Sequence, residues 1–159
     1  MSVIITDRLF SGKRNVPWDD VELYLKRYVG ECIRVVSSGD DIVIPSDFPD
    51  EYSGSVYTKK LRGAAAKAKA NLVSDLKPII QSASNREYLH NKNPKHAKDA
   101  AYGWYRYRIH FGILVQGESE QFPRINYYKG TLVVRINDRG NELYDIINIK
   151  KEASKPLEP

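Results

Sequence analysis

Residues 96–111, HAKDAAYGWYRYRIHF, bring together side chains of the types that act on phosphodiesters. The segment contains the imidazole of His96, the guanidinium groups of Arg106 and Arg108, and the indole of Trp104. An imidazole titrates near neutral pH, a guanidinium binds phosphate oxygens through a planar fork of donors, and an aromatic ring stacks on a base. The segment therefore favours metal-independent cleavage of RNA, in which the 2′-hydroxyl is the nucleophile and the protein supplies acid, base and cations.

Each of these residues receives an expected role. We expect His96 to transfer protons, Arg106 to bind phosphate, and Trp104 and Arg108 to bind the nucleic acid. His110 is a second candidate for proton transfer, and Tyr144 adds a hydroxyl contact to phosphate. Structural alternatives stay open, because His96 can lie in a solvated loop and Arg106, flanked by tyrosines, can be a cation–π partner.

Alternation along a strand divides this segment into two faces. If residues 104–111 form a strand, one face carries Trp104, Arg106, Arg108 and His110, and the other carries Tyr105, Tyr107, Ile109 and Phe111. We expect the second face to be core and the first to be the working surface.

A basic helical region precedes this strand, at residues 56–84. Its apolar residues follow three- and four-residue spacing, which predicts a long helix or a broken pair with a kink at Pro78. The expected opposite face carries Lys59, Lys60, Arg62, Lys67, Lys69 and Lys77. This face is either a solvated helix surface or a surface that binds phosphates.

The remaining patterns predict an α+β fold in a single domain of residues 1–150. Residues 17–29 read as an amphipathic helix, residues 32–36 and 41–45 as a hairpin, and the turn-rich residues 46–55 as a loop. Three later runs of β-forming residues, within 104–150, predict a C-terminal antiparallel meander. We expect residues 151–159 to be a peripheral or disordered tail.

Composition excludes several classes of function. The 159 residues carry a formal charge of +5, which favours polyanionic partners modestly, and the single cysteine fits a reducing compartment. Phosphate-loop, nucleophile-elbow and zinc-protease motifs are missing, and the three histidines lack the spacing of metal ligands, so we expect neither metal nor cofactor. No apolar run is long enough for a signal peptide or a membrane helix, so we expect a cytoplasmic protein.

Four strings of sequence carry a resemblance to a known family: YTKKLRGAAAKAKAN, NREY, KHAKDAAYGWYRY and LYDIINIKKEASKPLE. Together they resemble a domain of phage and integrative-element proteins of Firmicutes, similar to nuclease-like domains of the barnase/EndoU/colicin/RelE class, over roughly residues 14–158. The resemblance implies a helical N-terminal part packed on a twisted antiparallel sheet that carries the active site. It marks His96, Asp99, Trp104, Tyr105, Arg106, Tyr144, Asp145 and Lys150. The family pattern has other residues at Arg108 and His110, which puts a catalytic role for His110 in doubt.

Two functions of different classes follow. The first is a metal-independent endoribonuclease-like protein of a mobile genetic element, with RNA as its partner. The second is a non-catalytic phage-encoded inhibitor that uses its basic face against a host nuclease or ribonucleoprotein, in the manner of an anti-CRISPR protein. A structural or packaging accessory stays open as a third alternative. Convergence of His96, Arg106 and Tyr144 in one cleft would favour the first.

Overall fold

The computed structural model describes residues 3–11, 14–116 and 122–157. Its helices are α1 (Trp18–Leu25), η1 (Lys26–Tyr28), α2 (Phe48–Gly54), α3 (Val56–Lys60), α4 (Gly63–Asn71), η2 (Leu72–Asp75), α5 (Leu76–Gln81) and η3 (Pro94–His96), where η marks a 3₁₀ helix. Its strands are β1 (Val3–Ile5), β2 (Cys32–Arg34), β3 (Asp41–Val43), β4 (Ser84–Leu89), β5 (Trp104–Val115), β6 (Arg124–Asn137) and β7 (Gly140–Pro156). No helix in these described ranges is long and apolar enough to cross a membrane.

The strands of the described chain form one seven-stranded mixed sheet in an α+β arrangement, with the order β1-β5-β6-β7-β3-β2 and with β4 also paired to β5. The long strands β5, β6 and β7 are antiparallel, but β1 is parallel to β5 and β3 is parallel to β7. The predicted C-terminal antiparallel meander is therefore wrong as a description of the sheet. The hairpin predicted at residues 32–36 and 41–45 does form, as β2 and β3. The parallel pairings of β1 and β3 leave no such local signal, because their partners β5 and β7 are far away in the sequence.

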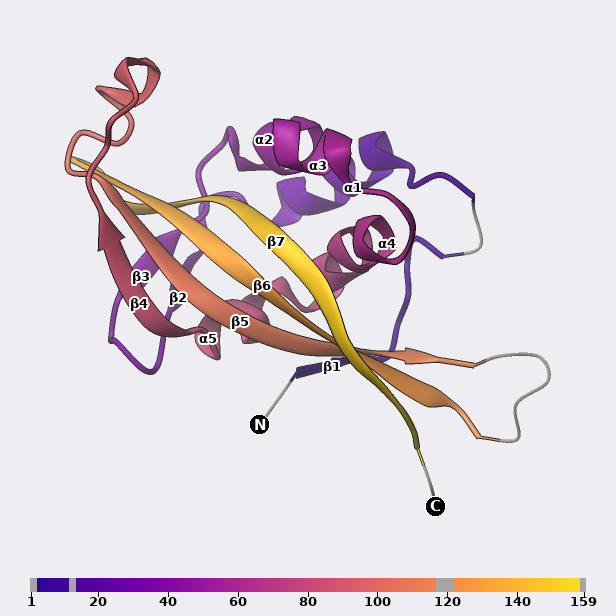
Figure 1. Ribbon diagram of the computed structural model, residues 1–159. Helices are drawn as coiled ribbons and strands as arrows, with labels where there is room; N and C mark the ends of the chain where they lie inside the picture. Colours follow the sequence, from indigo (N-terminus) through magenta and orange to yellow (C-terminus); the bar gives the residue numbers. More distant parts are fainter. Residues whose placement is uncertain (1–2, 12–13, 117–121, 158–159) are drawn as a thin grey trace.

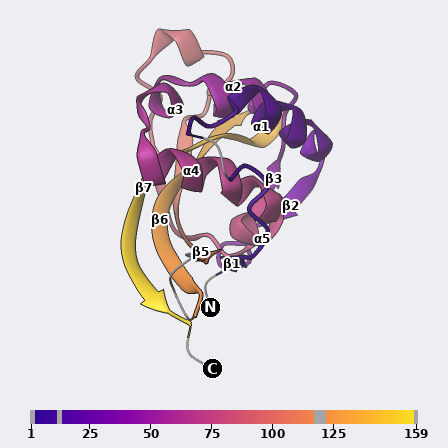
Figure 2. The same cartoon turned by 90° about the vertical axis from the view of Figure 1, so that its right-hand side faces the viewer.

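The sheet curls, which brings β4 close to the turn between β2 and β3 (Figure 1). The hydroxyl of Tyr107, on β5, donates a hydrogen bond to Asp40 in the turn between β2 and β3, at 2.6 Å. Arg86 of β4 binds the same carboxylate at 2.8 Å. The helices gather on one side of the long strands, as the quarter turn in Figure 2 also shows. Buried side chains from the helices and from the Tyr107 face of β5 form the core between them.

Helix α2 replaces the loop predicted for residues 46–55. Pro49 stands in its first turn, where a proline costs no hydrogen bond, and Asp50 and Glu51 in the same turn favour the helix dipole. Phe48 and Tyr52 lie four residues apart and are both buried. The loop was predicted because turn-forming residues surround this apolar pair in the sequence.

The basic helical region is broken more often than its periodicity indicates. Arg62 is extended and Gly63 has a positive φ of 58°, so α3 ends and α4 starts in a new direction. Lys69, predicted to lie on the exposed basic face, is fully buried. That prediction is wrong because it assumed one continuous helix axis through residues 59–77.

Two further segments pair with the sheet although their sequences read as irregular. Residues 84–89, for which the sequence predicts no strand, form β4 beside the start of β5. Residues 151–156, predicted as a peripheral or disordered tail, continue β7 along β6, so that Arg124 faces Pro156. Residues 158 and 159 of the predicted tail lie outside the described residues.

Candidate functional site

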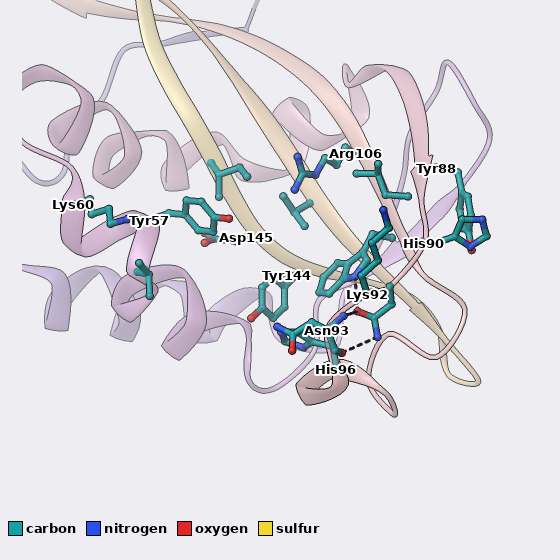
Figure 3. A pocket seen from close by; sticks show the side chains of 16 residues that line it. Tyr57, Lys60, Tyr88, His90, Lys92, Asn93, His96, Arg106, Tyr144 and Asp145 are labelled. Carbon is teal, nitrogen blue, oxygen red and sulfur yellow. Dashed lines mark hydrogen bonds between the residues drawn. The ribbon is translucent and has the colours of Figure 1, made fainter.

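A pocket of about 890 Å³ opens beside the first half of β5, between helix α3, strand β7 and the loop after β4 (Figure 3). We call it the main pocket. Its lining includes five residues singled out from the sequence as catalytic or nucleic-acid-binding: Lys60, His96, Trp104, Arg106 and Tyr144. His96, Arg106 and Tyr144 thus line one pocket, although they come from the 3₁₀ helix η3 and two different strands.

Strand alternation positions the pocket face of β5 as predicted. Tyr107, Ile109 and Phe111 are buried in the core, whereas Arg108 and His110 are exposed on the opposite face. Arg106 follows the same alternation and faces the main pocket. The division of residues 104–111 into a core face and an open face is confirmed.

The rings of Trp104 and Tyr144 pack around His96 in the wall of the main pocket. The ring centroids of His96 and Trp104 are 5.1 Å apart, those of His96 and Tyr144 are 5.4 Å apart, and those of Trp104 and Tyr144 are 5.1 Å apart. All three pairs meet edge to face, a favourable arrangement for aromatic rings. This packing restricts the imidazole at the end of the short helix η3.

A carboxylate fixes the orientation of His96. Its Nδ1 lies 2.9 Å from Asp99, and Asp99 in turn lies 3.4 Å from the buried guanidinium of Arg135. With Nδ1–H donated to a carboxylate, Nε2 is the ring nitrogen left for proton exchange with a ligand. Asp99 was marked by the family resemblance alone, and Arg135 was missed, because nothing in the strand pattern separates it from other strand cations.

Arg106 differs from most other arginines of the sheet, which form hydrogen bonds or ion pairs with other side chains. Among the described residues no hydrogen bond or ion pair engages its guanidinium, although Glu87 is its neighbour across β4. Arg135, by contrast, binds Asp47, Asp99 and Glu142. The Arg106 guanidinium is therefore free to bind an anion in the main pocket.

Tyr144 enters the pocket through an irregularity in β7. Val133 faces Asp145 and Val134 faces Leu143, so Tyr144 is the extra residue of a β-bulge. Its hydroxyl donates to Glu51 at 2.8 Å, and burial together with this carboxylate raises the pKa of Tyr144. The hydroxyl predicted to contact phosphate is thus held by α2, and the ring is the part that packs on His96.

Lys69 and Asp145 form a buried ion pair behind the pocket. The ammonium Nζ lies 2.7 Å from Asp145 Oδ1 and 2.6 Å from the hydroxyl of Thr58. Asp145 lines the pocket, yet its Oδ2 has no hydrogen-bond partner among the described residues. Burial lowers the pKa of Lys69 and raises that of Asp145, and their mutual attraction opposes both shifts.

The other predicted nucleic-acid-binding residues lie outside the main pocket. Lys59, Arg62 and Lys67 are exposed, and Arg62 donates to the backbone carbonyls of Lys59 and Leu61. Arg108 follows Arg106 on the same face of β5 and lines a second hollow. Among the cations predicted for the basic helical region, all of them within the described residues, Lys60 alone lines the main pocket.

Sequence reasoning missed part of the lining. Tyr57, His90, Asn91 and Lys92 all line the main pocket, the last three from the loop after β4. The side-chain carbonyl of Asn91 accepts a hydrogen bond from Trp104 Nε1 at 3.4 Å. The polar run HNKN was the available signal, but its place in space depends on the unpredicted strand β4.

The side chains of the described residues offer no group of three or more potential metal ligands. Comparisons with protein-family models, with curated proteins and with solved structures give no match for this chain. The resemblance to phage nuclease-like domains therefore stays a prediction.

Proposed function

We propose that this protein is a metal-independent endoribonuclease whose active site is the main pocket. The observation that carries the proposal is the unpaired guanidinium of Arg106 in the same pocket as an oriented His96 and the ring of Trp104. Clustered polar groups of this kind in a cavity are typical of catalytic sites.

The reaction assigns one role to each group. Nε2 of His96 accepts the proton of the RNA 2′-hydroxyl as that oxygen attacks the adjacent phosphorus. Arg106 binds the non-bridging oxygens, where negative charge grows in the transition state. The bond from phosphorus to the 5′-oxygen breaks, and the products are a 2′,3′-cyclic phosphate and a 5′-hydroxyl.

The leaving 5′-oxygen needs a proton, and His90 is the second imidazole that lines the pocket. In Figure 3 His90 lies beside Tyr88, away from His96, and its ring meets that of Tyr88 edge to face. A base on one side of the phosphate and an acid on the other suit an in-line displacement. Trp104 stacks on a neighbouring base.

Cleavage of a fluorescent single-stranded RNA in excess EDTA tests the proposal. We expect wild-type protein to yield cyclic-phosphate products, and His96→Asn and Arg106→Gln each to lower kcat/KM at least about a hundredfold. Arg34→Gln is the matched control, because Arg34 pairs with Asp41 on the β2–β3 hairpin. An inert wild type, or variants as active as Arg34→Gln, would remove the catalytic assignment.

The second candidate is a phage-encoded binder that inhibits a host nuclease or ribonucleoprotein without turning over RNA. The exposed cations Lys59, Arg62 and Lys67, which lie outside the main pocket, favour it. Positive charge on a protein surface raises the rate of association with polyanionic partners, and it needs no catalytic group to do so. Capture of a stable host complex by wild type, with no RNA cleaved, and its loss on replacing these three residues with glutamine would select this function.

A further inference from the structure

A second hollow, of about 500 Å³, lies farther along the face of the sheet that carries Arg106. Strands β5, β6 and β7 all contribute to it. Its side chains are polar or charged and include Arg108, Lys129, Thr131, Asn148, Lys150 and Glu152. We call it the strand hollow.

Strand register places like charges side by side in this hollow. His110 faces Lys129 across β5 and β6, and Lys129 faces Lys150 across β6 and β7. Like charges directly opposite each other destabilise a sheet. A bound anion would offset the repulsion between Lys129 and Lys150.

The cations of the strand hollow are also unpaired. In the part of the chain that the structure describes, no carboxylate engages Arg108, Lys129 or Lys150. The one acid among the lining residues, Glu152, lies 3.1 Å from Nδ1 of His110. Among the described residues, the hollow therefore presents three cationic side chains that form no ion pair, beside one acid that contacts His110.

The strand hollow and the main pocket are neighbours along β5, since Arg106 lines the main pocket and Arg108 lines the strand hollow. Arg106 and Arg108 are two residues apart on β5 and lie on one face, so their Cα atoms are about 6.6 Å apart along the strand. Successive cations at this separation follow a polyanion whose charges repeat regularly. The row begins at the proposed site of cleavage and leads away from it.

We propose that the strand hollow binds phosphates of the single-stranded RNA that flank the cleaved linkage. This inference rests on the proposed function, because it takes Arg106 as the cation at the scissile phosphate. A protein partner fits less well, since the hollow lacks the buried aromatic or apolar anchors that dominate protein interfaces.

Fluorescence anisotropy with labelled oligonucleotides tests the inference in the His96→Asn background, so that the RNA stays intact. We expect Lys129→Gln/Lys150→Gln to weaken binding of a 12-nucleotide RNA about tenfold or more and to leave binding of a dinucleotide unchanged. The slope of log affinity against log salt should fall by about 1.4, the value for two lost contacts to single-stranded phosphates. Lys26→Gln/Arg34→Gln removes the same charge from exposed sites elsewhere and should change neither affinity.

Other results of these measurements would count against the strand hollow as an RNA site or would separate RNA binding from RNA cleavage. Unchanged 12-mer binding would overturn the inference, and so would an equal loss for the dinucleotide. Competition by a polyglutamate peptide of equal charge as strong as by RNA would replace RNA with an acidic protein. If wild type cleaves no RNA but the double variant binds the 12-mer more weakly, the catalytic assignment fails and the strand hollow remains a binding site.

Discussion

Lys69 joins helix α4 to strand β7 through one buried ammonium group. It is fully buried, and its charge is met by Asp145 and by the hydroxyl of Thr58. A buried ion pair adds little net stability, but removing one partner leaves an uncompensated charge in the interior. Because Asp145 also lines the main pocket, this pair couples the stability of the domain to the shape of the site.

Lys69→Met is therefore expected to lower the free energy of unfolding by about 3 to 5 kcal/mol. The double variant Lys69→Met/Asp145→Leu should recover most of this loss, because it removes both charges. Urea denaturation followed by tryptophan fluorescence measures both values. A single variant as stable as wild type would show that Asp145 is neutral in the folded protein.

The types of the side chains alone were enough to select His96, Trp104 and Arg106 from the sequence, and these three residues do line one pocket. The type of a side chain could not show whether the folded protein buries it or holds it in a hydrogen bond. Tyr144 has the right side chain, but Glu51 of α2 holds its hydroxyl. Lys69 has the right charge, but it is buried. Both depend on a helix that comes from another part of the sequence.

Among the elements, β5 depends on how its chain enters at Gly103. This residue has φ of 99°, and a Cβ there would lie 2.6 Å from the backbone oxygen of Leu89 and 2.6 Å from the hydroxyl of Tyr88. Its carbonyl also accepts a hydrogen bond from Ile136 of β6. Only glycine allows β4, β5 and β6 to meet directly beside Trp104.

Gly103→Ala should destabilise the protein by about 1 to 3 kcal/mol, the usual cost of forcing a side chain into this backbone conformation, or more if β4 cannot move. We also expect the substitution to displace Trp104, which a shift in tryptophan emission would report, and to weaken RNA binding. Gly54→Ala serves as comparison, because it has open space around it and ordinary φ. Equal effects of the two substitutions would contradict this account.

Elements with a strong local pattern could be predicted from sequence, whereas those made by distant contacts could not. β5 matches the run WYRYRIHFGILV, and the β6–β7 hairpin turns at Asp138 and Arg139 within NDRGN. By contrast β4, α2 and the end of β7 have polar or turn-forming sequences. They become regular because neighbouring strands or the core satisfy their backbone and apolar groups.

Across the whole molecule, one buried guanidinium connects the sheet with two loops. Arg135 of β6 binds Glu142 of β7, Asp47 before α2 and Asp99 after η3. Burial alone would raise the pKa of Glu142, but hydrogen bonds from Arg139, Asn137 and Arg135 lower it to about 2. The cluster also holds Asp99, and through it the ring of His96.

This shift makes the stability of the whole domain depend on pH. Because the folded pKa of Glu142 lies below its ordinary value of 4.5, its contribution is complete above about pH 4.5 and is lost as pH falls toward 2. Glu142→Gln should lower the free energy of unfolding by about 2 kcal/mol at pH 7, allowing for partial screening by solvent, and by much less near pH 2.

Denaturant unfolding between pH 2 and 7 measures the difference, with exposed Glu31→Gln as the control. A constant gap between Glu142→Gln and wild type over this range would mean that Glu142 stabilises the protein through packing alone and not through its charge.

The parallel pairing of β1 with β5 has a consequence for the order of events during synthesis. Val3 faces Phe111, so the partner of β1 leaves the ribosome only after every described helix up to η3 has been made. At 5–20 residues per second, β1 waits for several seconds with its backbone groups unpaired. During that time Val3, Ile4 and Ile5 cannot make their pairing with β5, so the edge of the sheet that β1 forms is completed late in synthesis.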